Sequence, residues 1–121
     1  DDLVQAFLEM FQLVDHHRAV TELFLRYRCD PVAMGGVMHR FGRDMSVDLA
    51  RQLTAQIKKG GIAHPPADWV QATADSLMEA SFAAIDAHLA GRGLSVEASA
   101  RLLAAFSAAA CLGVVQAMPS R

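Results

Sequence analysis

The chain has 121 residues, of which 53% are hydrophobic and 20% are charged, and it carries a formal net charge of −2. This length suits one ordinary domain with its own core, and a slightly acidic chain lacks the basic excess that neutralises nucleic-acid phosphates. We therefore expect a single domain over residues 1–121 that does not bind DNA by itself.

Two helices are predicted at the start of the chain, where apolar residues recur at helical spacing and no segment alternates as a strand does. The first runs from Asp2 to about Val14. A break or bend is expected at residues 15–17, and a second helix then ends near residues 29–30. Its apolar stripe has the i, i+3, i+4, i+7 spacing of an amphipathic helix: Val20, Leu23, Phe24 and Tyr27.

A long third helix is predicted to begin at residues 30–31, where Asp30 is the N-cap and proline takes the first helical position. Two lysines and two glycines at 58–61 close it, because cations suit a helix C-terminus and glycine suits a left-handed cap. Gly35-Gly36 and Gly42 fall inside it, which predicts tight packing, a kink, or a weak point that moves when a ligand binds. Its apolar stripe is Met34, Met38, Phe41, Met45, Leu49, Leu53 and Ile57.

Two further helices complete the prediction. The fourth spans about residues 67–90 and stops at the Gly-Arg-Gly of 91–93. Ser95 caps the fifth, Glu97 lies in its first turn, and Pro119 ends it. The sequence therefore predicts an all-α fold, a bundle of five helices packed in orthogonal and antiparallel pairs.

The fifth predicted helix carries only two charges, Glu97 and Arg101, so most of its surface is apolar or small. Such a helix must be buried nearly all round, which five helices of one chain cannot readily achieve. We therefore expect a homodimer in which the last two helices form an intermolecular four-helix bundle. The alternative is that this helix is the centre of a monomeric bundle. The expected interface residues are Ala105, Phe106, Ala109 and Gly113.

The five histidines do not complete a recognisable catalytic or metal site. His16 and His17 are adjacent, so they face different sides of a helix and cannot readily chelate one ion. No Glu-x-x-His element, haem-attachment motif, phosphate loop or nucleophile elbow is present. We expect no catalytic residue, no metal and no cofactor.

Methionine and aromatic side chains on the second to fourth helices are typical of apolar ligand cavities, although each is also a common core residue. We expect a small apolar or amphipathic molecule to bind between these helices, with His39, Tyr27 and Trp69 offering polar groups. The predicted ligand-binding residues are Phe24, Tyr27, Met34, Met38, Phe41, Met45, Trp69, Met78 and Phe82.

Cysteine usage and the absence of targeting signals predict a cytoplasmic protein. Cys29 and Cys111 lie far apart and belong to no metal-binding or redox pattern. No secretory signal opens the chain. The uncharged run of residues 102–118 is shorter than the roughly 20 residues of a spanning helix and only mildly hydrophobic, so we expect no membrane span.

Three predicted features of the chain occur together. Two shorter helices come before the segment Arg-Tyr-Arg-Cys-Asp-Pro (26–31), and a long helix ends in Gln-Ile-Lys-Lys-Gly-Gly-Ile (56–62). Two long helices rich in small residues follow. This arrangement resembles the C-terminal half of TetR-family transcriptional repressors. The resemblance implies a homodimer through the last two helices, a pocket enclosed by the helices before them, and ligand-controlled release of operator DNA. DNA binding would belong to an N-terminal helix-turn-helix domain that is not present in this chain.

The sequence thus predicts the regulatory domain of a ligand-responsive repressor, and not an enzyme. A ligand that prefers one arrangement of the second to fourth helices would change the spacing of the two DNA-binding domains. One alternative is a dimeric adaptor without a ligand, which a cavity near Met38 and Phe82 would argue against. Another is a small helical enzyme, which two histidines and a carboxylate in one cleft would favour.

Overall fold

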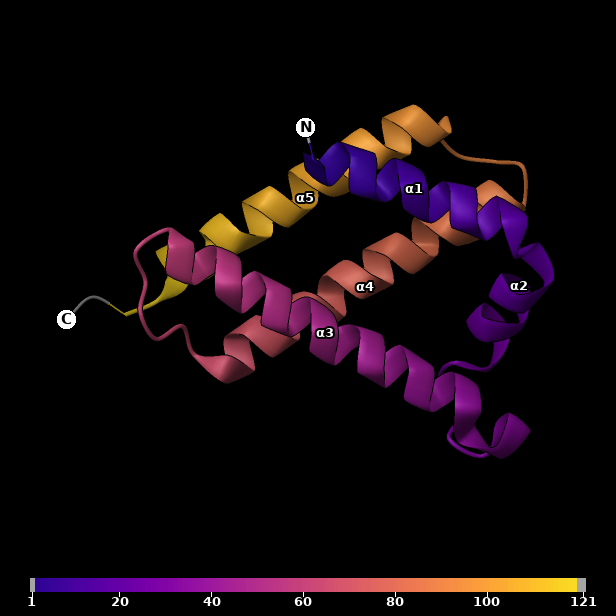
Figure 1. The fold of residues 1–121 in the computed structure, drawn as a ribbon, viewed down its shortest axis with the longest axis horizontal. Coiled ribbons are helices and arrows are strands. Elements are labelled where there is room, and N and C mark those ends of the chain that lie inside the picture. Colours follow the sequence, from indigo (N-terminus) through magenta and orange to yellow (C-terminus); the bar gives the residue numbers. More distant parts are fainter. Residues whose placement is uncertain (1, 120–121) are drawn as a thin grey trace.

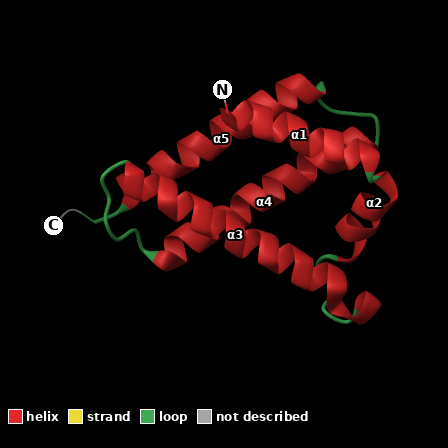
Figure 2. Ribbon diagram, in the orientation of Figure 1, coloured by secondary structure: helices red, strands yellow, loops and turns green. Residues whose placement is uncertain are grey.

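A computed structural model describes residues 2–119, and Figure 1 shows that helices account for most of the chain. No strand occurs among these residues (Figure 2), which confirms the prediction of an all-α fold with five α-helices. A short 3₁₀ turn, η1, precedes the third helix. The elements are α1 (Asp2–His16), α2 (Arg18–Tyr27), η1 (Ala33–Gly36), α3 (Val37–Lys59), α4 (Ala67–Leu89) and α5 (Val96–Ala117).

Most helix boundaries lie where capping residues and glycines predict them. His17 separates α1 from α2. The Ser95 side chain accepts a hydrogen bond of 3.1 Å from the backbone N–H of Ala98 and so caps α5. Gly61 closes α3 with a φ of 100°, a conformation that glycine adopts without steric strain.

The start of the third helix is the boundary that the prediction misplaced. Asp30 accepts hydrogen bonds from the backbone N–H groups of Val32 (2.9 Å) and Ala33 (3.0 Å), and these bonds lower the pKa of its carboxyl group. The capped segment is only the turn η1, because residues 34–36 all have positive φ values, between 53° and 76°. A right-handed helix cannot pass through such residues. Helix α3 therefore begins at Val37, and Met34 lies outside it.

Gly36→Ala is expected to destabilise the chain through this turn. A Cβ at Gly36 would lie 2.8 Å from the carbonyl oxygen of Pro31, and its φ of 76° disfavours any L side chain. The expected loss is about 1–3 kcal/mol of unfolding free energy, measured by urea denaturation. Gly35→Ala is the matched control, because Gly35 has a similar φ of 67° but no atom within 4 Å of its Cβ position. Equal losses at the two positions would contradict the clash with Pro31.

Helix α4 is the central element of the bundle. It packs against α3 on one side and against α5 on another, while α1 packs along α5. Figure 1 shows α4 running between the α1–α5 pair and α3, with α2 at one end.

Two hydrophobic clusters of buried residues, both containing residues of α4, form the core. The first joins α1, α2, α4 and α5, and the second joins α3, α4 and α5. Because α4 belongs to both clusters, its position depends on every other helix. The first cluster comprises Phe11, Val14, Phe24, Phe82, Ile85 and Leu103. The second comprises Leu53, Ile57, Val70, Ala74, Leu77 and Val114.

Helix α5 keeps a large apolar surface in contact with solvent. Leu102, Phe106 and Leu112 are 44%, 48% and 57% exposed. Among the residues that the structure describes, α5 is also the one helix whose length and composition would allow a membrane span. Exposed apolar residues that form a contiguous patch are typical of interaction surfaces.

Candidate functional site

A cleft of about 630 Å³ opens where the end of α2 meets α3 and α4. Its volume falls within the roughly 300–1,000 Å³ of small-molecule sites. Gly42, Met78 and Phe82 give it an apolar floor, and polar side chains of α3, of α4 and of the residues that follow α2 surround that floor. The cleft therefore combines the two kinds of surface that an amphipathic molecule contacts.

Gly42 sets how closely α3 approaches α2 beside the cleft. A Cβ at this position would lie 3.4 Å from Cζ of Phe24 and 4.0 Å from Cβ of Arg28. A larger side chain would therefore press on the buried ring of Phe24. The predicted role of this glycine in tight packing agrees with the geometry, and α3 continues through it without a break.

Arg28 joins the end of α2 to α4. Its Nη1 and Nη2 donate to the two carboxylate oxygens of Glu79 at 2.6 and 2.8 Å, and its guanidinium carbon lies 4.6 Å from the ring centroid of Phe82. The hydrogen bond to Glu79 raises the pKa of Arg28. A two-bond arginine–carboxylate pair stacked on a ring has a defined orientation, so it fixes the α2–α4 distance at this point.

A second polar link joins α3 to α4. The Ser46 hydroxyl donates to Oδ1 of Asp75, and Nε2 of Gln71 donates to Oγ of Ser46 (2.9 Å) and to the same carboxylate oxygen (3.0 Å). Ser46 bonds directly to Asp75, so the group lacks the intervening imidazole of a Ser-His-Asp triad. His39 is the one histidine among the residues that line this cleft.

Sequence reasoning missed both polar links. Arg28 and Glu79 are 51 residues apart, and Ser46 and Asp75 are 29 residues apart. Neither pair forms a motif with fixed spacing. The sequence shows only that these helices carry charged residues beside their apolar stripes. That observation does not identify which charged residues pair with each other.

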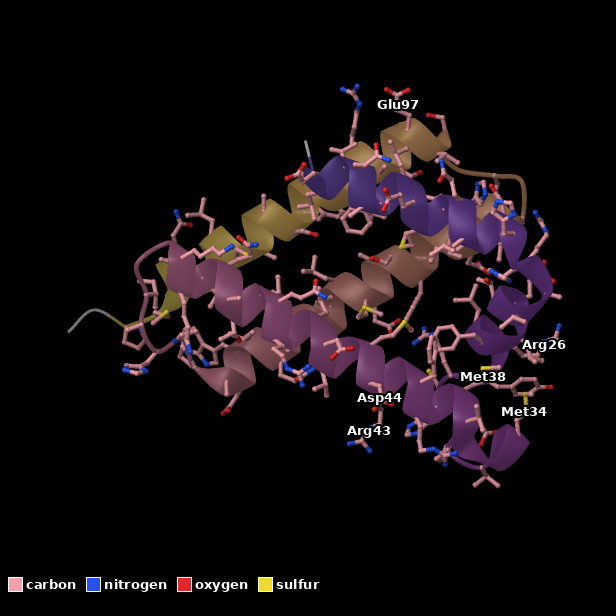
Figure 3. The ribbon with its side chains drawn as sticks, in the orientation of Figure 1. Arg26, Met34, Met38, Arg43, Asp44 and Glu97 are labelled. Atoms are coloured by element: carbon pink, nitrogen blue, oxygen red, sulfur yellow. The ribbon has the colours of Figure 1, made fainter. Side chains whose placement is uncertain are left out.

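The structure brings two of the nine predicted ligand-binding residues, Met78 and Phe82, to the cleft. Three others belong to the packed interior: Phe24 is buried, and Met38 and Met45 contact the first hydrophobic cluster. Figure 3 shows Met38 pointing from α3 toward α2. These placements favour a structural role for Phe24, Met38 and Met45.

The remaining predicted residues lie apart from the cleft. Met34 is 48% exposed and lies in the left-handed turn. Phe41 is 53% exposed, and its ring packs edge-to-face with the ring of Phe24, with 5.5 Å between the ring centroids. Tyr27 is half-buried at the end of α2. The expectation that Trp69 lies near Tyr27 and Phe82 is wrong, because Trp69 lies at the other end of α4 and faces α5.

Trp69 belongs to a shallow groove between α4 and α5. Small residues of α4 line one side, and Phe106, Ala109 and Gly113 of α5 line the other. Ala105 is exposed on α5 but does not line the groove. Three of the four residues predicted for a dimer interface therefore share one surface. The α4 side comprises Trp69, Ala72, Thr73, Ser76, Leu77 and Ala80.

Outside the cleft, some titratable side chains of the described residues form ion pairs that link helices. Nε2 of His88 lies 2.7 Å from Oδ1 of Asp15 and links α4 to α1. Within residues 2–119, no three His, Cys, Asp or Glu side chains are placed to hold a metal ion. Cys29, at the edge of the cleft, and Cys111 are both free thiols.

No protein-family model matches the chain, and comparisons with curated proteins and with solved structures also found no match.

Proposed function

We propose that the chain is the regulatory domain of a TetR-like transcriptional repressor. It binds a small amphipathic molecule, forms a homodimer, and controls operator binding by a DNA-binding domain outside residues 1–121. The observation that carries the proposal is that α4 lines the cleft with one face and the α4–α5 groove with another. A ligand that displaces α4 therefore acts on the dimer contact directly.

The cleft supports the sensing part of this function. Its volume, its apolar floor and its ring of polar side chains are those of a small-molecule site. Its walls belong to three helices that two side-chain links hold together, Arg28 with Glu79 and Ser46 with Asp75. A ligand that fits one spacing of these helices better than another shifts the population toward that spacing.

The α4–α5 groove supports the dimer. Ala109 and Gly113 recur one turn apart on α5 beside exposed Phe106, a pattern that allows close contact between helices. A second copy of the chain offers the same small-residue surface, so a two-fold axis at the groove makes a four-helix bundle. This contact covers the apolar face of α5 without a lipid environment.

The sensing function is tested by adding a panel of amphipathic compounds and following thermal unfolding together with Trp69 emission. A compound at 100 times its Kd is expected to stabilise the chain by about 2.7 kcal/mol. Trp69 lies in the groove and not in the cleft, so a change in its emission reports coupling to the dimer contact. Failure of every compound to raise the unfolding midpoint contradicts the sensing function.

A dimeric adaptor without a ligand is the second candidate. The packing of Phe24, Met38 and Met45 in the first hydrophobic cluster favours it, since these side chains contribute to the core and do not line the cleft. Both the adaptor and the sensor are expected to dimerise, so the oligomeric state does not distinguish the two functions. A rise in the unfolding midpoint with added ligand is expected only for the sensor.

Met78→Ala is expected to weaken ligand binding about fivefold, because it removes apolar contact area at the floor of the cleft. Binding is measured by isothermal titration calorimetry with a compound found in the panel. Met10→Ala is the matched control, since Met10 packs on the same hydrophobic cluster from α1 but does not line the cleft. Equal weakening by the two variants would show a general loss of stability and not a ligand contact.

A further inference from the structure

We propose that residues 31–36 form a two-state hinge. One state is the left-handed turn of this structure, and in the other α3 continues back to Pro31 as one helix. The helical state draws the end of α2 away from α3 and so widens the cleft. The two states themselves need no ligand, whereas their role in ligand entry rests on the proposed sensing function.

The segment already contains the start of a helix. Asp30 accepts hydrogen bonds from the backbone N–H groups of Val32 and Ala33, which are the second and third residues of a helix that begins at Pro31. Val32 has right-handed helical angles, with a φ of −106° and a ψ of −39°. The helical period of α3 also extends back to Met34. Residues 34–36 are what separates this first turn from α3.

The left-handed turn and the continuous helix carry backbone costs of similar size. Met34 is the one non-glycine residue with a positive φ, 53°, in the part of the chain that the structure describes, and a left-handed angle is costly for any residue with a Cβ. The continuous helix places Gly35 and Gly36 in its interior, where glycine is unfavourable. Backbone preference therefore does not decide between the two states, and the contacts of the segment do.

Few contacts hold the turn in place. Val32 and Met34 are 80% and 48% exposed, so the turn does not bury its apolar side chains. Nη1 of Arg40 donates to the carbonyl oxygen of Gly35 at 3.0 Å, and Gly36 is buried. Figure 1 shows the segment before α3 at the outer end of the bundle, away from α4 and α5. A segment with so little buried apolar surface belongs to the least stable part of a fold.

The helical state changes the wall of the cleft that follows α2. Six residues of a helix rise about 9 Å, so Pro31 moves outward along the axis of α3. The backbone turn at residues 28–30 opens to supply this length, because three extended residues reach about 10 Å. Arg28 and Cys29 line the cleft, so their movement breaks the ion pair of Arg28 with Glu79 and widens the entrance.

The test is NMR spectroscopy of the whole chain without a ligand. Relaxation dispersion is expected to show exchange at residues 31–36 with a minor state of about 1–10%, and the Arg28 Nε–H signal is expected to exchange at the same rate. Gly35→Ala is expected to raise the ratio of helix to turn at least about tenfold, because alanine favours a helix and disfavours a left-handed φ. No atom lies within 4 Å of a Cβ at Gly35, so a clash does not interfere. Met34→Gly is expected to lower the ratio by a similar factor, and the ¹³Cα shifts of residues 32–36 measure both changes.

Gly61→Ala is the matched control, because Gly61 also has a positive φ, 100°, and open space at its Cβ position, but lies at the other end of α3. It is expected to leave the shifts of residues 32–36 unchanged. An unmodified chain without exchange, or left-handed shifts that persist at residues 34–36 in Gly35→Ala, overturn the hinge. Exchange at residues 31–36 beside a static Arg28 signal overturns the widening of the cleft. The sensing function stands in either case, since the ligand panel tests it separately.

Discussion

Gly113→Arg is expected to convert the proposed dimer into a folded monomer at micromolar concentration. Nothing lies within 4 Å of a Cβ at Gly113, so a single chain has room for the arginine. In the proposed four-helix contact, the same position would meet the helices of a second copy, where a long charged side chain would be buried without a counter-charge. Such a charge costs several kcal/mol at an interface, which is enough to dissociate a micromolar dimer.

The measurement is light scattering coupled to size exclusion, with circular dichroism to show that the helices persist. Ala109→Arg, on the same groove, is expected to act in the same way. Ala108→Arg is the matched control, because Ala108 is an exposed alanine of α5 that does not line the groove. A monomeric unmodified chain, or dissociation by Ala108→Arg to the same extent, would contradict a dimer through this surface.

The helices and most of their ends could be predicted because their causes are local. Ser95 caps α5 with its own side chain, and Gly61 ends α3 through its own φ angle. Periodicity located the apolar face of each helix for the same reason. These are properties of a few consecutive residues, so they can be read before any tertiary contact is known.

The misplaced start of α3 shows where two local signals conflict. Met34, Met38 and Phe41 continue the helical period through Gly35-Gly36, so periodicity predicted one unbroken helix. The glycine pair instead takes left-handed angles that glycine adopts without steric strain, so α3 begins only after it, at Val37. Hydrophobic periodicity indicates which side chains would share one face of a helix. It carries no information on whether the residues between them favour helical φ and ψ angles.

The cleft was predicted only in part because its polar residues act across long sequence distances. Periodicity identifies Met38 and Met45 as inward-facing, but whether a face meets a void or a packed neighbour depends on the other helices. Phe24 fills that space. The proposed dimer surface rests on a local signal, because the sequence alone shows a helix that is rich in small residues and carries only two charges, Glu97 and Arg101.

Phe82→Ala is expected to cause the largest loss of stability of any substitution in the cleft. The ring is 9% exposed, packs edge-on against Phe24 with 5.3 Å between centroids, and supports the Arg28 guanidinium. Its removal leaves a cavity in the first hydrophobic cluster, which typically lowers the unfolding free energy by about 3–5 kcal/mol. Urea denaturation at one protein concentration measures the change, because the proposed dimerisation would make stability depend on concentration.

Phe41→Ala is the control for this prediction. Phe41 also contacts Phe24 edge-on, with 5.5 Å between centroids, but it is 53% exposed. Burial, and not the ring contact alone, determines the size of the cavity left behind, so Phe41→Ala is expected to cost about 1 kcal/mol. Similar losses from the two variants would show that the Phe24 contact dominates, and that Phe82 is no more important to the core than its exposed counterpart on α3.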